Sequence, residues 1–139
     1  MIRRRINPGR GKHQAGFTLL ELMIVISIIL ILLSISIPQY QQSLLHAKEA
    51  VLKQDLYVLR SAIDQYTLDK QKAPQSLEDL AQAGYLKSLP KDPFTNSRET
   101  WVTVNEDSIL AVDQQQPGIS DVHSGASQTS SDGTPYSEW

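Results

Sequence analysis

Cysteine is absent from this 139-residue sequence, which excludes disulfide bonds, thiol nucleophiles and cysteine-bound metals. A folded domain in this chain must therefore be held by its apolar core, by helix packing or by a metal bound through other side chains. The chain also lacks a glycine-rich phosphate loop and a His-Glu-x-x-His zinc motif, and its three histidines lie far apart in the sequence. We therefore expect a building block rather than an enzyme.

Acidic residues are missing from the first 16 positions, where five of the 13 lysines and arginines lie. The other eight basic residues face 15 acidic ones, so the rest of the chain carries a formal charge of −7. A basic start followed by an acidic body obeys the positive-inside rule for membrane proteins. This charge balance gives no support for nucleic-acid binding.

Charge is missing altogether from residues 22–37, which are Leu, Ile, Met, Val and three serines. As a helix, residues 17–37 would span roughly 31 Å, about the thickness of the hydrocarbon core of a bilayer. A basic start and an apolar run are the outline of a secretory signal, but Ser34-Ile35-Ser36 is a poor small-x-small cleavage site. We therefore expect a membrane-spanning helix over residues 17–38, closed by Pro38.

One acid, Glu21, stands at the edge of the apolar run, and two interpretations of it remain open. With Thr18 it fits the S/T-x-x-E capping box of a helix start, where negative charge also suits the helix dipole. Alternatively, cleavage after Gly16 gives Phe17 a positive amine one turn away, and the two charges neutralise each other within one subunit or between neighbours. A plain anchor needs no such acid, because a carboxylate deep in a membrane costs about 2.5–3.5 kcal/mol.

Residues 16–25, Gly-Phe-Thr-Leu-Leu-Glu-Leu-Met-Ile-Val, resemble the class III signal of type IV prepilins and type II secretion pseudopilins. The resemblance implies that a membrane aspartyl protease, the prepilin peptidase, cuts after Gly16 and methylates the new amino terminus at Phe17. It also implies that Glu21 directs filament assembly by pairing with a neighbour's amino terminus. The same resemblance implies that the helix can loosen at Pro38 in the filament.

The family resemblance further implies a function and partners. It indicates a structural subunit of the type II secretion pseudopilus, a homo-oligomeric filament that drives protein export. The implied partners are minor pseudopilins, the prepilin peptidase, and an inner-membrane assembly platform with its ATPase. The implied location is the bacterial inner membrane, crossed once, with the C-terminal domain in the periplasm. Two alternatives remain open: a type IV pilin, major or minor, for adhesion, motility or DNA uptake, and a signal-anchored extracytoplasmic binding domain that never polymerises.

The sequence divides into a cleaved leader at residues 1–16, the spanning and filament-core helix at 17–38, and an extracytoplasmic domain at 39–139. Within the domain a helix is predicted over residues 39–70, because apolar side chains recur on one helical face. We expect Pro38 to kink the chain without ending the helix. A coiled coil is the alternative for this face, but fewer than four clean heptads disfavour it. The predicted face consists of Leu45, Leu52, Leu56, Leu59, Ile63 and Tyr66.

An α/β region is predicted over residues 71–112. A short helix begins at Ser76 and ends at Gly84, and residues 100–104 and 108–112 are predicted to pair as an antiparallel hairpin. Between them, residues 89–94 resemble a segment of type II secretion major pseudopilins, and we expect Asp92 to cap a turn and Phe94 to fill the core. Trp101 is expected to be buried. The predicted fold is α+β and type IV pilin-like, a long N-terminal helix packed on a small antiparallel sheet.

The last segment, residues 113–139, is rich in Ser, Gly, Gln and Asp and would be disordered if left alone. Because it ends with Tyr136 and Trp139, we expect it to dock on the domain. The pseudopilin resemblance implies a calcium ion in this loop, and calcium takes six to eight oxygen ligands. A plain turn at residues 131–134 is an equal alternative, and His123 is expected to be a hydrogen-bonded loop residue. The candidate calcium ligands are Asp121, Ser124, Ser131 and Asp132.

Overall fold

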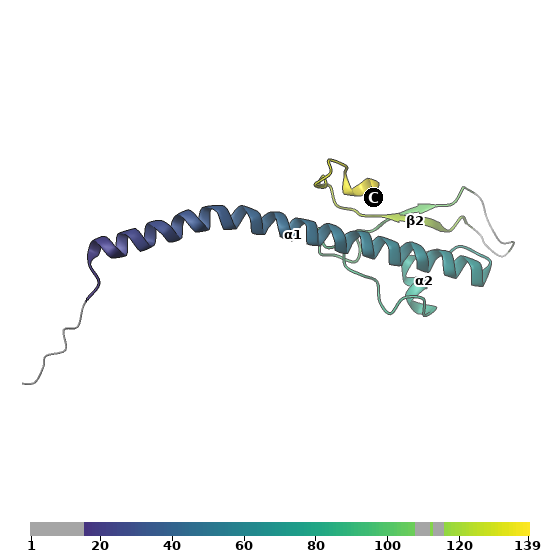
Figure 1. Cartoon of the computed structure of the whole chain (residues 1–139). Coiled ribbons are helices and arrows are strands. Elements are labelled where there is room, and N and C mark those ends of the chain that lie inside the picture. Colours follow the sequence, from purple (N-terminus) through teal and green to yellow (C-terminus); the bar gives the residue numbers. More distant parts are fainter. Residues whose placement is uncertain (1–15, 108–111, 113–115) are drawn as a thin grey trace, which may run out of the picture. The chain divides into compact units, whose positions relative to one another are not determined.

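The computed structural model of the chain describes residues 16–107, 112 and 116–139. Their secondary structure is α1 (Leu19–Lys70), α2 (Leu77–Gln82), β1 (Val102–Asn105), β2 (Ile119–His123) and the 3-10 helix η1 (Tyr136–Glu138) (Figure 1). The chain divides into two compact units, residues 1–39 and 40–139. The expected leader, apart from Gly16, lies outside the described residues.

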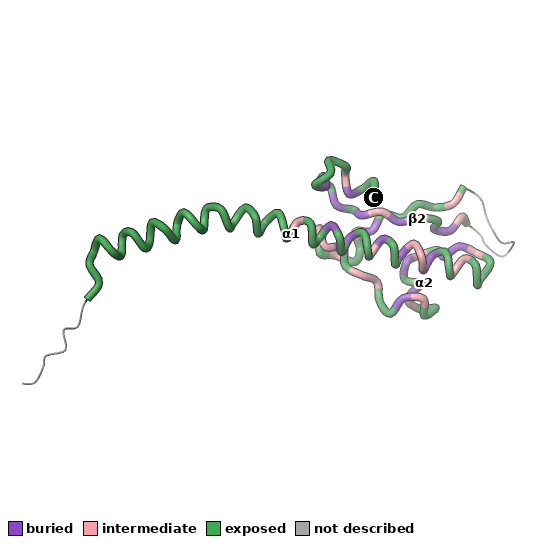
Figure 2. The backbone as a smooth tube through the Cα atoms, viewed as in Figure 1, coloured by how far each residue is buried: buried purple, intermediate pink, exposed green. Residues whose placement is uncertain are grey.

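In the first unit the described residues form the start of α1, and every side chain there is exposed (Figure 2). Thr18 Oγ1 accepts the Glu21 N–H at 3.1 Å, which satisfies one of the free N–H groups at the helix start. Ser27, Ser34 and Ser36 donate their hydroxyls to carbonyls of the preceding turn at 2.7–2.9 Å. The three hydroxyls of the apolar run are thus satisfied inside the helix, as a lipid environment requires. By length and composition, α1 can cross a membrane.

Pro38 lies inside α1 and does not end it. The expectation that the helix continues through Pro38 is confirmed by the observed bounds, Leu19–Lys70. The chain tolerates this proline because the helix on both sides of it is long enough to propagate without the missing hydrogen bond.

In the second unit, the predicted apolar face of α1 forms the core. Four of its members are at most 2 % exposed, namely Leu52, Leu56, Leu59 and Ile63, while Leu45 and Tyr66 are half-buried. The same core takes in side chains from α2, β2 and the C-terminal segment, and each of these segments contains buried residues (Figure 2). Helix packing against a small sheet is thus confirmed. The residues contributed by these other segments include Leu77, Leu80, Ile119, Val122 and Tyr136.

The sheet pairs two strands that lie far apart in the sequence. β1 pairs antiparallel with β2, with Val102 opposite His123 and a register shift between Val104 and Asn105. The partner strand predicted at residues 108–112 lies, apart from Val112, outside the described residues. That pairing therefore stays a prediction, and β2 lies in the segment that was expected to be a loop. β2 takes this position because Ile119 and Val122 bury their side chains in the core.

The loop predictions for the middle of the domain are confirmed. The Asp79 carboxylate accepts the Ser76 N–H at 3.0 Å at the start of α2. Asp92 Oδ1 accepts the Phe94 N–H at 2.8 Å, which closes the expected turn, and Phe94 packs against the core. Trp101 is buried, and its indole N–H donates to the Pro90 carbonyl at 2.9 Å.

We expect Leu59→Ala to destabilise the domain by about 2–5 kcal/mol, because Leu59 is 0 % exposed and its truncation leaves a cavity among rigid neighbours. Thermal unfolding of the detergent-solubilised chain, followed by tryptophan fluorescence, measures the loss. The same substitution at Leu68, which is 70 % exposed on the same helix, is the matched control and should cost less than about 0.5 kcal/mol. Equal losses at the two positions would contradict the assigned core.

Candidate functional site

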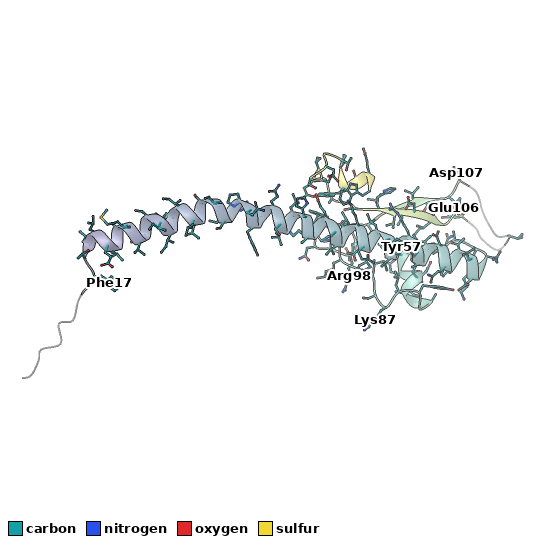
Figure 3. All side chains as sticks on the ribbon, in the orientation of Figure 1. Phe17, Tyr57, Lys87, Arg98, Glu106 and Asp107 are labelled. Atoms are coloured by element: carbon teal, nitrogen blue, oxygen red, sulfur yellow. The ribbon has the colours of Figure 1, made fainter. Side chains whose placement is uncertain are left out.

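The predicted processing site lies just before α1, in backbone without regular secondary structure. Gly16 and Phe17 precede the helix, and the Phe17 side chain is 85 % exposed (Figure 3). A Cβ added at Gly16 would meet no described atom within 4 Å. Exposed, non-helical backbone of this kind is accessible to a peptidase. Cleavage after Gly16 and methylation of Phe17 stay predictions.

Glu21 lies in the first turn of α1. The Thr18 half of the expected capping box is formed, because the threonine hydroxyl accepts the Glu21 N–H. Within residues 16–107 and 116–139, the Glu21 carboxylate makes no hydrogen bond or ion pair. Its role in assembly, like a loosening of the helix at Pro38, stays a prediction.

The C-terminal segment docks on the domain, as its two aromatic residues predict. Tyr136 is 0 % exposed and stacks on Phe94 with ring centroids 4.0 Å apart. Trp139 meets Tyr136 edge to face at 5.1 Å. Aromatic contacts of this kind add to the free energy gained by burying the rings. The tail is therefore part of the folded domain.

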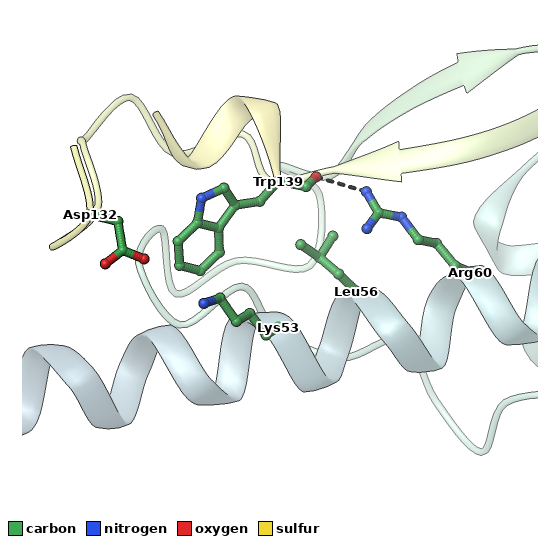
Figure 4. Close-up of a pocket in the computed structure, with 5 residues that line it drawn as sticks. All are labelled: Lys53, Leu56, Arg60, Asp132 and Trp139. Atoms are coloured by element: carbon green, nitrogen blue, oxygen red, sulfur yellow. Dashed lines mark hydrogen bonds between the residues drawn. The ribbon is translucent and has the colours of Figure 1, made fainter. Parts of the chain in front are cut away.

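A pocket of about 270 Å³ lies between α1 and the end of the tail (Figure 4). Lys53 Nζ lies 4.4 Å from the centroid of the Trp139 ring, and Arg60 Nη2 donates to the Trp139 main-chain oxygen at 2.7 Å. Both cations are thus engaged in holding the tail, and we assign the pocket a structural role. Its lining consists of Lys53, Leu56, Arg60, Asp132 and Trp139.

The structure does not gather the candidate calcium ligands into one set. Asp121 Oδ1 accepts from Arg60 Nε at 2.6 Å, the buried Ser124 hydroxyl donates to the Asp92 carboxylate, and Ser131 donates to Glu49. Ser131 and Asp132 share one turn of the tail. The described part of the chain contains no group of three His, Asp or Glu side chains that could hold a metal. These ligands do not fit a calcium site in this arrangement, so the calcium prediction has no support from it.

Glu49 is the residue that the sequence analysis missed. It is only 6 % exposed, although it carries a carboxylate in the middle of a core-facing helix. Its position was visible in the spacing, because it lies four residues after Leu45 and three before Leu52, on the apolar face. Burial acts to raise the pKa of Glu49, but hydrogen bonds from Ser131 and Tyr136 outweigh burial and hold that pKa below its ordinary value. Burial and the nearby carboxylate raise the pKa of Tyr136 to about 12.

Arg60 is a second residue whose role only the structure reveals. Besides Asp121, its guanidinium donates to the Val122 carbonyl at 2.9 Å and to the Trp139 oxygen. It therefore ties α1 to β2 and to the tail at once. Partial burial would raise the pKa of Asp121, but the Arg60 and Val122 hydrogen bonds hold it below its usual range. His123 is hydrogen-bonded, as expected, with Nδ1 at 2.6 Å from the Trp139 oxygen, but it is the last residue of β2 and does not lie in a loop.

Comparison with known proteins identifies relatives of this chain. The family model of the prokaryotic N-terminal methylation motif matches residues 11–37. The type II secretion system core protein G of Pseudomonas aeruginosa is 37 % identical over 101 residues, which cover 61 % of this chain and 71 % of the relative. That of Escherichia coli K12 is 36 % identical over 121 residues, 76 % of this chain and 81 % of the relative. No solved structure matches the chain.

The methylation-motif match spans Gly16, Phe17 and Glu21, the residues that the sequence analysis selected. The core protein G of Vibrio cholerae is also similar, at 36 % identity over 100 residues and 68 % of its length. These matches cover 61–76 % of this chain, so each is longer than the N-terminal unit of residues 1–39 and includes part of the domain that follows. The chain therefore belongs to the core protein G family of type II secretion pseudopilins.

Proposed function

We propose that this pseudopilin is a structural subunit of the type II secretion pseudopilus and that it drives protein export as a building block rather than as an enzyme. The proposal is supported mainly by the features of residues 16–37. This segment combines an exposed Gly16–Phe17 peptide, a carboxylate at Glu21 without a hydrogen bond or ion pair among the described residues, and an uncharged run at residues 22–37 that is exposed throughout. The methylation-motif match over residues 11–37 supports it.

The proposed path begins in the inner membrane. The basic leader holds the precursor with residues 17–38 across the bilayer and residues 39–139 in the periplasm. The prepilin peptidase cuts after Gly16 and methylates Phe17. An assembly platform and its ATPase then move the subunit from the bilayer into a homo-oligomeric filament that also contains minor pseudopilins. The exposed apolar helix supports this path, because its side chains need lipid before assembly and neighbouring helices after it.

Glu21 has a specific part in the proposed assembly. A carboxylate in the apolar filament core is costly when unpaired and tolerable when a positive amine lies beside it. The incoming subunit supplies its own Glu21 and meets the free amine of a neighbour's Phe17. When the subunit enters at the correct height along the filament axis, the Glu21 carboxylate and the neighbour's amine pair with each other. At any other height both charges are buried without a partner. The acid thereby sets the register of the stack.

We expect Glu21→Ala to leave cleavage intact and to lower incorporation into sheared filaments by roughly tenfold or more, because a lost partner of a buried charge pair costs about 2–5 kcal/mol. Intact mass measures cleavage, and immunoblotting of the sheared fraction measures incorporation. Thr18→Ala is the matched control, since it removes the helix cap at 3.1 Å and keeps the carboxylate. Normal filaments from Glu21→Ala would contradict the proposed pairing of Glu21 with a neighbour's amino terminus.

A deletion strain tests the wider assignment. Loss of secreted enzymes from the medium, restored by the wild-type gene, is the expected result. Secretion that continues while surface pili disappear would instead identify a type IV pilin. An uncut precursor in cells that contain the prepilin peptidase would favour the anchored, non-polymerising domain.

A further inference from the structure

The carboxylate of Glu49 is almost enclosed by the C-terminal tail. Its Oε1 accepts the Ser131 N–H at 2.6 Å and the Tyr136 hydroxyl at 2.9 Å, and its Oε2 accepts the Ser131 hydroxyl at 2.6 Å. His46 Nδ1 lies 3.5 Å from Oε2, one turn earlier on α1. The side chain of Glu49 is 7 % exposed. Both oxygens of one helix carboxylate are therefore used to bind residues more than eighty positions away.

The tail is shaped to present donors to that carboxylate. Residues 130–134 form a tight turn, in which the Ser130 N–H donates to the Thr134 carbonyl at 2.8 Å and the Gly133 N–H to the Ser130 carbonyl at 3.0 Å. An isolated bridge between Thr129 and Pro135 closes the base of the turn. The turn holds the Ser131 N–H and hydroxyl toward α1. A preformed set of donors binds an anion with little loss of entropy on docking.

This polarity is opposite to that of a calcium site. A calcium loop turns six to eight oxygen acceptors inward, whereas this loop turns N–H and O–H donors toward an anion supplied by α1. Two cations, Lys53 and Arg60, also contact Trp139 at the end of the tail. Of the candidate ligands, Asp121 is occupied by Arg60. Two of the candidate ligands, Asp121 and Ser131, are thus bound to Arg60 and Glu49 of α1.

We propose that Glu49 anchors the C-terminal tail of this pseudopilin in place of a metal ion, so that the domain folds and keeps its tail docked without any divalent cation. The anchor couples the first helix of the domain to the last residues of the chain. It needs no filament and no processing, so it stands independently of the proposed function. The anchor consists of Glu49, Ser131 and Tyr136.

The first arm of the test compares the wild-type chain, purified in detergent, in excess EGTA and in calcium chloride. Hydrogen exchange of the peptide at residues 128–139, read by mass spectrometry, reports docking of the tail, and thermal unfolding reports the whole domain. We expect the same exchange rates and melting temperatures within about 1 °C in both buffers. Calcium-dependent protection of this peptide, or a melting temperature raised by several degrees, would overturn the proposal.

The second arm compares a substitution at Glu49 with one at a candidate calcium ligand, Asp132. Glu49→Gln keeps the shape of the side chain but points an amide NH2 group at donors, so exchange of residues 128–139 should rise about tenfold or more. Asp132→Asn is the matched control, because it neutralises a candidate calcium ligand and leaves Glu49 intact. We expect no change from it. Faster exchange in Asp132→Asn than in Glu49→Gln would assign the tail to a cation instead.

Milder variants cover the case in which Glu49→Gln does not fold. Ser131→Ala removes one hydroxyl donor, and Tyr136→Phe removes another while keeping the stack on Phe94 at 4.0 Å. Each should speed exchange of the tail severalfold in EGTA and calcium alike. Wild-type exchange rates in both variants would show that the Glu49 contacts do not hold the tail, and the proposal would fail.

Discussion

Gly16→Val is expected to keep residues 1–16 attached to the chain and to remove the protein from filaments. The β-branched side chain would occupy the peptidase subsite that a glycine leaves empty, so we expect cleavage to slow about a hundredfold, equal to ~2.7 kcal/mol of lost transition-state binding. Without cleavage Phe17 has no free amine, and Glu21 has no charge to pair with. Intact mass of the membrane form measures processing, which removes 16 residues and adds one methyl group.

The structure indicates that Gly16→Val tests recognition by the peptidase and not stability of the fold. A Cβ at Gly16 meets no described atom within 4 Å, so the substitution introduces no clash that would unfold the protein. Gly11→Val places the same side chain in the same basic leader and should be processed normally. Complete cleavage of Gly16→Val would contradict both the assigned cut and the assembly mechanism that depends on it.

Gly125→Ala is expected to destabilise the domain by about 3 kcal/mol, near the upper end of the range for overpacking. A Cβ at this position would meet the carbonyl oxygen of Thr100 well inside van der Waals distance and the carbonyl carbon at 3.0 Å. The backbone at Gly125 is held because the neighbouring Ser124 is hydrogen-bonded to the buried Asp92. The backbone at Thr100 is held because the neighbouring Trp101 is buried in the core. The melting temperature should fall by about 4–8 °C per kcal/mol, as measured by tryptophan fluorescence of the full chain.

Gly133→Ala separates this clash from the general effect of replacing a glycine. Gly133 has a positive φ of 85° but no atom within 4 Å of an added Cβ, so alanine there costs only the left-handed backbone conformation, about 1–2 kcal/mol. Gly125→Ala should therefore be the more damaging change. The reverse order would show that residues 124–126 and Thr100 are not packed as the structure has them.

The long helix was predictable from the sequence alone, because the signals that specify it are spacings and hydrogen bonds between residues a few positions apart. Apolar residues at spacings of three and four define the face of Leu52, Leu56 and Leu59, and each member is buried. Thr18 and Ser76 mark helix starts through hydrogen bonds that span at most three residues. Such signals depend on neighbours along the chain, so pattern reasoning captures them.

The partner of β1 was not predictable in the same way. β2 reads Ile-Ser-Asp-Val-His, with its buried residues three apart rather than in strict alternation. It also follows a Pro-Gly pair and lies in a polar segment, which are features of a loop. Its strand conformation depends on pairing with Val102–Asn105 and on burying Ile119 and Val122 against α1. Recognition of β2 as a strand therefore requires the core to be present.

By itself, the sequence determined the basic leader, the uncharged spanning helix with its single acid at Glu21, and the core face of that helix, because charge, length and periodicity act over one or a few turns. Only the tertiary structure decided that Glu49 is buried and that Asp121 and Ser131 bind Arg60 and Glu49. The physical reason is distance along the chain. A carboxylate on a helix is stable in a core only when donors come to meet it, and those donors lie 82 and 87 residues further on.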